Sequence, residues 1–177
     1  MSIDLETVVI DGDTIRIRHT SLFGRGCAGR KLSECTISVL RLYGVDAPET
    51  AKFGNPAQPY SEEAAEFTSN LVYDRVVRVK LLGKDRYYRV IGKVAVPNKF
   101  LPFLRKKDLS TSLVERGYAS LYTGGGAEYD GKREELEKKI RRAQEKKQGI
   151  WSNGVDNYVD PADYKREIRA RKNGSKW

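Results

Sequence analysis

The stretch Arg41–Glu49 (RLYGVDAPE) limits the fold more than any other part of the chain. Pro48 fixes its own φ and pushes the residue before it out of the helical region, so no helix runs through this stretch. Side chains alternate along a strand, so Arg41 and Asp46 are expected to point to opposite faces. If both serve one site, the strand must bend between them, and Gly44 suits a bulge or sharp bend. We therefore predict a strand that breaks at Gly44 and ends in an acidic turn.

An arginine, a bend and two carboxylates in so short a stretch are typical of a site for a phosphorylated ligand and a divalent cation. Arg41 supplies the planar donors, and Asp46 and Glu49 supply the hard oxygen ligands. The alternative is a strand that simply ends in a polar turn.

Hydrophobic periodicity predicts an α+β protein. Five short strands with an inserted helix favour a five-stranded OB-type β-barrel with about three helices, a fold whose faces often bind oligonucleotides. The expected strands cover residues 6–10, 15–18, 36–42, 76–82 and 89–96, and the expected helices cover residues 61–71, 108–116, 129–147 and, in a basic tail, 161–172.

Capping residues and apolar stripes give these helices more detail. Ser61 is predicted to cap the first helix, and Asp108 the second. Leu136, Ile140 and Ala143 form a narrow apolar stripe on the helix expected at residues 129–147, and Ile150-Trp151 beyond it is expected to fold back onto the core.

The net charge of +9 favours a polyanionic partner, although a moderately basic surface also serves solubility. No apolar run approaches the roughly 20 residues that span a bilayer. Met1–Asp4 lacks the basic start and apolar core of a signal peptide, so we expect no export signal in the chain as given. The compartment stays open, because a leader or anchor trimmed from the chain would not be seen.

The cysteines, Cys27 and Cys35, are too few for a zinc site, since His19 is the only histidine. We expect free thiols; one disulfide closing a loop is the alternative in an oxidising compartment. The glycine-rich segment 19–33 is expected to be a long basic loop.

Four motifs follow one another along the chain: Asp11–Thr14 (DGDT), Arg41–Glu49, Asp85–Arg89 (DRYYR) and Gly149–Ser152 (GIWS). With this order and spacing the chain resembles the staphylococcal (micrococcal) nuclease, or thermonuclease-like, family over about residues 5–152. The resemblance implies a nuclease-like OB-fold domain at 1–152, followed by a basic C-terminal tail at 153–177.

The resemblance also implies a role for each motif residue. It assigns catalysis to Arg41, Glu49 and Arg89; calcium binding to Asp13, Asp46 and the backbone carbonyl of Ala47; and an outer position near the metal to Asp11. From residue type we add three candidates for contacts to phosphates or bases, which otherwise are ordinary surface or core residues: Arg86, Tyr87 and Tyr122.

The implied activity is that of a Ca²⁺-dependent endonuclease. Such an enzyme hydrolyses phosphodiester bonds in single-stranded or frayed DNA and RNA with little sequence preference, and typically leaves 3′-phosphates. The alternative is a non-catalytic OB-type nucleic-acid-binding module, but a degenerate copy should have lost some of the catalytic and metal-binding side chains, and all are present. Two positions depart from the family pattern. The family usually has a small residue in place of Tyr88, and it commonly has a threonine in place of Ala47.

The expected partners are DNA and RNA, with no obligate protein partner and a monomeric chain. The basic loop and tail are expected to strengthen binding without selecting sequence. The stretch Lys99–Lys107 (KFLPFLRKK) resembles a shallow membrane contact, but Pro102 prevents an amphipathic helix. We favour core packing for its apolar residues.

Overall fold

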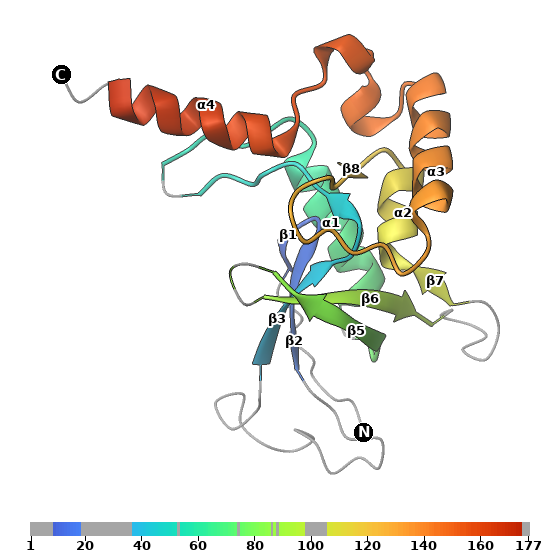
Figure 1. Cartoon of the computed structure of the whole chain (residues 1–177). Helices are drawn as coiled ribbons and strands as arrows, with labels where there is room; N and C mark the ends of the chain where they lie inside the picture. The colour runs from blue at the N-terminus through green and yellow to red at the C-terminus, as the bar shows by residue number, and fades with distance from the viewer. Residues whose placement is uncertain are drawn as a thin grey trace.

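The computed structural model describes residues 9–18, 37–52, 54–73, 75–85, 87, 89–97 and 106–174. These residues form a mixed α+β structure in which a twisted sheet is flanked by helices (Figure 1). The strands are β1 (Val9–Asp11), β2 (Thr14–Arg18), β3 (Ile37–Leu42), β4 (Val45–Asp46), β5 (Arg78–Lys84), β6 (Val90–Val96), β7 (Lys107–Asp108) and β8 (Ser120–Leu121). The helices are α1 (Ser61–Val72), α2 (Leu109–Glu115), α3 (Arg133–Glu145) and α4 (Pro161–Gly174).

The main sheet has six strands, in the order β1-β2-β3-β6-β5 with β7 added to β6. Its ladders are antiparallel except for the parallel pair β3 and β6. A separate antiparallel ladder joins β4 to β8. This confirms the predicted α+β class and agrees with an OB-type fold, although the described pairings form an open path rather than a ring. Two short strands, β7 and β8, were not expected from the sequence.

The predicted break at Gly44 is confirmed. β3 ends at Leu42, and Gly44 turns the chain with a φ of +67°, so that β4 leaves the main sheet and pairs with β8. A Cβ at Gly44 would lie 2.8 Å from Cδ1 of Leu136, so the position excludes a side chain for steric as well as conformational reasons.

The later helices follow the sequence closely. Asp108 caps α2 by accepting a hydrogen bond from the Thr111 backbone N–H at 3.1 Å. Leu136, Ile140 and Ala143 are all buried, as their spacing predicted. α3 begins at Arg133, later than predicted, because Asp130 and Gly131 both take positive φ and end any helical path before it.

The helix α1 begins at residue 61 as predicted, but the prediction that Ser61 caps it was wrong. Tyr60, in the left-handed region with a φ of 67°, occupies the N-cap position, and Ser61 is the first helical residue. The Ser61 hydroxyl is buried without a hydrogen-bond partner in the described part of the chain. The backbone N–H of Ser61 instead donates to the Gln58 carbonyl at 3.2 Å, so the preceding loop fixes the start of the helix.

The core lies between the sheet and helices α1 to α3. Trp151 is 3% exposed, as expected for a residue that folds back onto the core, and its ring lies 4.4 Å from that of Tyr158. No helix in the described residues is both long and apolar enough to cross a membrane. The expectations for the segment 19–33, for Cys27 and Cys35, and for Phe100–Leu104 concern residues outside the described ranges.

Candidate active site

The bend after β3 brings three charged side chains together. The Nη2 atom of Arg41 lies 2.5 Å from Oδ1 of Asp46 and 3.3 Å from Oδ2 of Asp13. Asp13 comes from the β1–β2 turn, where it also accepts hydrogen bonds from the Thr14 hydroxyl and the Ala47 N–H. All three charged residues are buried, with 4–8% of their surface exposed.

The buried carboxylates of Asp13 and Asp46 share one guanidinium, so one negative charge in this group of three side chains is not balanced. Burial and the neighbouring Asp13 carboxylate raise the pKa of Asp46 above its ordinary value, although Arg41 opposes them. Burial lowers the pKa of Arg41, but the charges of Asp13 and Asp46 outweigh it and leave the pKa raised. The arginine is therefore permanently charged, and the carboxylate pair favours a further cation.

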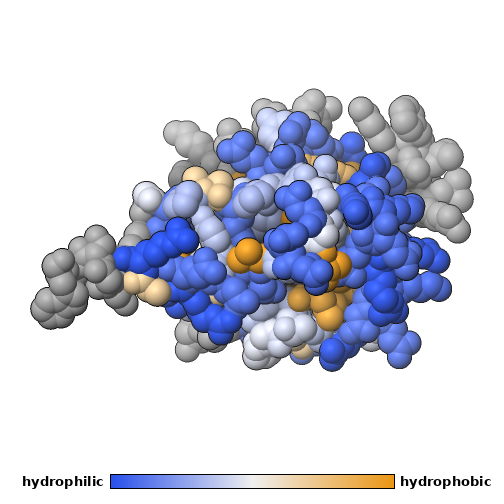
Figure 2. Space-filling model, turned by 90° about the horizontal axis from the view of Figure 1, so that it is seen from above, coloured by the Kyte–Doolittle hydropathy of each residue, from blue (hydrophilic) through white to orange (hydrophobic). Residues whose placement is uncertain are grey.

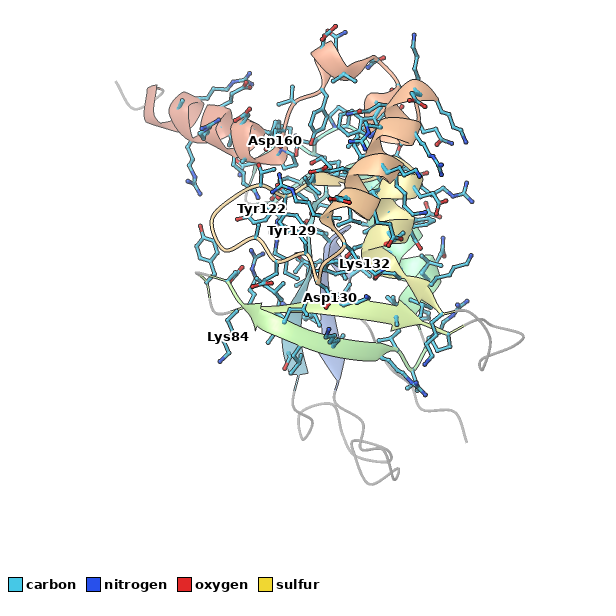
Figure 3. All side chains as sticks on the ribbon, turned by 45° about the vertical axis from the view of Figure 1, so that its right-hand side comes forward. Lys84, Tyr122, Tyr129, Asp130, Lys132 and Asp160 are labelled. Carbon is cyan, nitrogen blue, oxygen red and sulfur yellow. The ribbon has the colours of Figure 1, made fainter. Side chains whose placement is uncertain are left out.

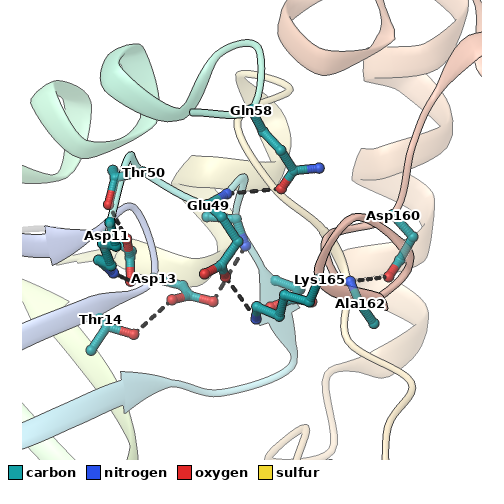
Figure 4. A network of polar contacts seen from close by, with 12 residues as sticks. Asp11, Asp13, Thr14, Glu49, Thr50, Gln58, Asp160, Ala162 and Lys165 are labelled. Atoms are coloured by element: carbon teal, nitrogen blue, oxygen red, sulfur yellow. Dashed lines mark hydrogen bonds and ion pairs between the residues drawn. The ribbon is translucent and has the colours of Figure 1, made fainter. Parts of the chain in front are cut away.

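Glu49 is held from two sides (Figure 4). Its backbone N–H donates to the Gln58 side chain at 2.9 Å, and its carbonyl accepts from the Gln58 N–H at 2.9 Å. Its carboxylate pairs with Lys165 of α4, with 2.7 Å between Oε1 and Nζ. Because Gln58 is buried and makes both backbone hydrogen bonds, it fixes the backbone of Glu49 in position.

Asp11 has partners of its own in the same turn. One oxygen accepts from the Thr50 hydroxyl at 2.6 Å, and the other lies 2.5 Å from Nζ of Lys52 (Figure 4 shows the Thr50 contact). Both partners lie within three residues after Glu49 in the chain. In this structure Asp11 therefore fastens the loop that presents Glu49.

Arg89 begins the opposite side of the site, just before β6. Its Nε lies 2.6 Å from Oδ2 of Asp85, and its N–H donates to the other oxygen of the same carboxylate. The guanidinium also lies 5.6 Å from the centre of the exposed Tyr87 ring. Arg86, the third candidate in this motif, lies outside the described residues.

Tyr122 stacks against the central arginine. Its ring centre lies 4.8 Å from Cζ of Arg41, and its N–H donates to the Gly44 carbonyl at 3.1 Å. Figure 3 shows Tyr122 on the segment that leads from β8 towards Tyr129, with Asp160 above it. The bend that breaks β3 thus also fixes this aromatic side chain.

These side chains border one cleft of about 700 Å³. Its lining includes the predicted residues Arg41, Asp46, Tyr87, Arg89 and Tyr122. Asp13 and Glu49 do not line it themselves, but each contacts a cation that does, Arg41 and Lys165 respectively. The structure therefore brings the described site residues together around one space, with Asp11 behind them.

The donors suit a hard cation only in part. In the described residues, no three Asp, Glu, His or Cys side chains gather closely enough to hold a metal ion by themselves. Asp13 and Asp46 do face a common centre, where a nitrogen of Arg41 now stands between them. Two carboxylates and a carbonyl are oxygen ligands of the kind Ca²⁺ takes, with water completing the shell.

The sequence analysis missed Gln58 and Lys165. Gln58 lies in a proline-rich loop with no recognisable pattern. Lys165 is one of many basic residues in the tail, and nothing local distinguishes it from Arg166 or Lys172. Only the folded chain, which places α4 against the loop that carries Glu49, reveals either residue.

Comparison with known proteins finds a matching family model and several relatives. A family model described as "Staphylococcal nuclease homologue" matches residues 39–153. The chain is 42% identical over 159 residues to "Endonuclease Htp3" of Saprolegnia parasitica, which covers 89% of this chain and 72% of that protein.

Two fungal proteins, each named "Probable endonuclease LCL3", are also similar. The protein of Komagataella phaffii is 39% identical over 138 residues, covering 77% of this chain and 58% of the relative. That of Schizophyllum commune is 34% identical over 180 residues, covering 95% of this chain and 61% of the relative. The chain thus spans under two thirds of the length of both.

Proposed function

Because the chain belongs to the staphylococcal nuclease family, we propose that it is a nuclease whose active site is the cleft around Arg41. The observation that carries the proposal is the meeting of Arg41 with Asp13 and Asp46, with Arg89 lining the same cleft. The names of the relatives support cleavage of nucleic acid within the strand. The proposed substrates are single-stranded or frayed DNA and RNA.

Arg41 and Arg89 are proposed to bind the oxygens of the scissile phosphate. A phosphodiester gathers negative charge on these oxygens in the transition state, and planar guanidinium donors match them better than a lysine does. In the described residues Arg41 directs only Nη2 at carboxylates, which leaves Nη1 and Nε for the phosphate. By analogy with other preorganised donors, each arginine contributes on the order of 10² to 10³ in rate.

Glu49 is proposed to accept the proton of the attacking water. As the water oxygen bonds to phosphorus, the bond to the 5′-oxygen breaks, and the leaving oxygen takes a proton from solvent. This gives a 3′-phosphate and a 5′-hydroxyl end. A positioned carboxylate in this role contributes about 10² to 10⁴ in rate.

Asp13, Asp46 and the Ala47 carbonyl are proposed to hold one Ca²⁺ ion, with Asp11 behind them. The bound ion supplies positive charge for the phosphate and a place to orient water. With so few protein ligands, the affinity should be modest and should rise when a substrate phosphate joins them.

The test is an end-labelled single-stranded DNA incubated with the purified protein in Ca²⁺ or in chelator. We expect fragments only with Ca²⁺, and we expect a 3′-phosphatase to slow their migration by removing charge. Binding without fragments in either condition would contradict the proposal and favour a non-catalytic OB-type module.

A further inference from the structure

Helix α4 lies beside the loop that carries Glu49 (Figure 1). Residues of this helix form one wall of the cleft. The residues that α4 and its cap contribute to the lining are Asp160, Ala162, Lys165, Arg166 and Arg169. The tail therefore reaches the site itself and is not a remote arm.

Specific contacts hold the start of α4 in place. The Tyr164 hydroxyl donates to the Pro56 carbonyl at 2.7 Å, and Pro161 is buried. Just before the helix, the Val159 carbonyl accepts from the Gln58 side chain at 3.3 Å. Gln58 thus joins α4 to the backbone of Glu49, so the helix and the catalytic loop are fixed relative to one another.

Apart from Ala162, the α4 residues that line the cleft are basic. Lys165 and Arg169 are one turn apart, about 6 Å along the helix, and so share a face. Within the described residues, Arg169 has no ion-pair partner, whereas Arg166 is paired with Asp163. Seen from above, the face that includes α4 is largely hydrophilic (Figure 2).

The ion pair between Lys165 and Glu49 is weak enough for Lys165 to take another anionic partner. Their side chains are 39% and 23% exposed, and partly exposed ion pairs contribute little to stability. The positive charge of Lys165 also acts on Asp46, where it lowers the carboxyl pKa against the larger effect of burial. Lys165 is thus close to the proposed metal ligands as well as to the proposed base.

We propose that Lys165 and Arg169 form a phosphate-binding row that holds the substrate strand next to the scissile phosphate. This inference rests on the proposed function and names a further part of the same site. When the strand enters, the Lys165 ammonium moves from the Glu49 carboxylate to a phosphate oxygen, and Glu49 is released to bind water. Arg169 binds the next phosphate along the strand.

The experiment compares the full chain with Lys165→Gln, Arg169→Gln and Arg171→Gln. Arg171 is the matched control, because it lies on the same helix, is exposed and does not line the cleft. Among the described residues its only ion-pair partner is Glu167, at 3.9 Å. Each variant loses one positive charge. Thermal melting of every protein used checks that it is folded.

Binding of a fluorescent single-stranded oligonucleotide is measured in chelator at several salt concentrations. Each phosphate contact contributes about 0.7 to the slope of log affinity against log salt for a single strand. We expect Lys165→Gln and Arg169→Gln each to lose about that much slope relative to Arg171→Gln. Slopes equal to that of Arg171→Gln would overturn the proposal.

Cleavage with Ca²⁺ separates binding from a purely positioning role. We expect Lys165→Gln to raise KM, and Lys165→Arg to restore it. A lower kcat with unchanged KM and unchanged salt slope would show that Lys165 only positions Glu49. That result would refute the proposal of a phosphate-binding row. If the intact chain does not cleave at all yet the slopes differ as expected, the phosphate row stands and the nuclease proposal falls.

Discussion

The guanidinium of Arg41 reaches the carboxylate of Asp46 at 2.5 Å, although regular strand geometry would point the two side chains to opposite faces. The turn at Gly44 allows this contact, because it directs the chain out of the main sheet so that Asp46 lies in the ladder with β8. The site therefore depends on a glycine that has no side chain of its own to offer.

Replacing Gly44 by alanine should destabilise the fold by about 1–3 kcal/mol, because the new Cβ is strained at positive φ and meets Leu136 at 2.8 Å. Gly54→Ala is the matched control, with a φ of +74° but nothing within 4 Å. Denaturant unfolding of both variants measures the difference. Equal losses would show that the backbone angle, and not the contact with Leu136, sets the cost.

Glu49→Gln should lower kcat by on the order of 10² to 10⁴ and leave the fold intact. The amide cannot take up the proton, while the Gln58 contacts involve only the backbone of this residue. Single-turnover cleavage with Ca²⁺ and a thermal melt give the two readings. A variant with full activity would falsify the assignment of the base.

Gln58→Ala should reduce kcat more than it changes KM. Without the side-chain amide, the Glu49 N–H loses its acceptor and the link to Val159 is lost, so the base is no longer held in place. Steady-state kinetics on a short oligonucleotide checks this. An increase in KM alone would instead place Gln58 in substrate binding.

Asp46→Asn should abolish Ca²⁺ binding, whereas Asp11→Asn should change it only several-fold. Asp46 faces the same centre as Asp13, while both oxygens of Asp11 are occupied by Thr50 and Lys52. Calorimetric titration of the two variants provides the comparison. If both lose the ion equally, Asp11 belongs among the direct ligands.

Asp85 should contribute stability that is lost in acid. Burial raises its pKa, but hydrogen bonds from the side chain and backbone of Arg89 and from the backbone of Tyr87 outweigh burial and lower it. A carboxyl with a lowered pKa stabilises the fold above its unfolded-state value near 4, and this contribution disappears as the pH falls through the folded-state value.

Asp85→Asn tests this pH dependence. The wild-type chain should be more stable than the variant at pH 6, and the difference should shrink below about pH 4. Cleavage should also fall, because Arg89 loses the partner that orients it. A stability difference that is constant from pH 6 to pH 3 would rule out the ionised carboxylate as the cause.

Local sequence was enough to predict several features, because their causes are local. The break at Gly44 follows from glycine and strand periodicity, the Asp108 cap from a side chain that reaches its own helix, and the burial of Leu136 from helical spacing. The contact of Arg41 with Asp46 is local once the bend is known.

What the sequence could not predict depends on distant parts of the chain. Lys165 meets Glu49 only because α4 folds against the loop after β4. Ser61 looked like a helix cap, but the loop ending at Tyr60 enters the helix in the left-handed conformation and makes Ser61 the first helical residue. Such contacts are set by tertiary packing, which overrides local preference.

The position of β3 between β2 and β6 also determines when the cleft is complete during synthesis. Arg41 pairs in register with Thr14 on one side and Ile91 on the other, so its place in the sheet is fixed only after β6 has left the ribosome. The wall that bears Lys165 and Arg169 follows later still. A growing chain therefore lacks the complete cleft until α4 has been made, so a strand can be held along both walls only after the last described helix is in place.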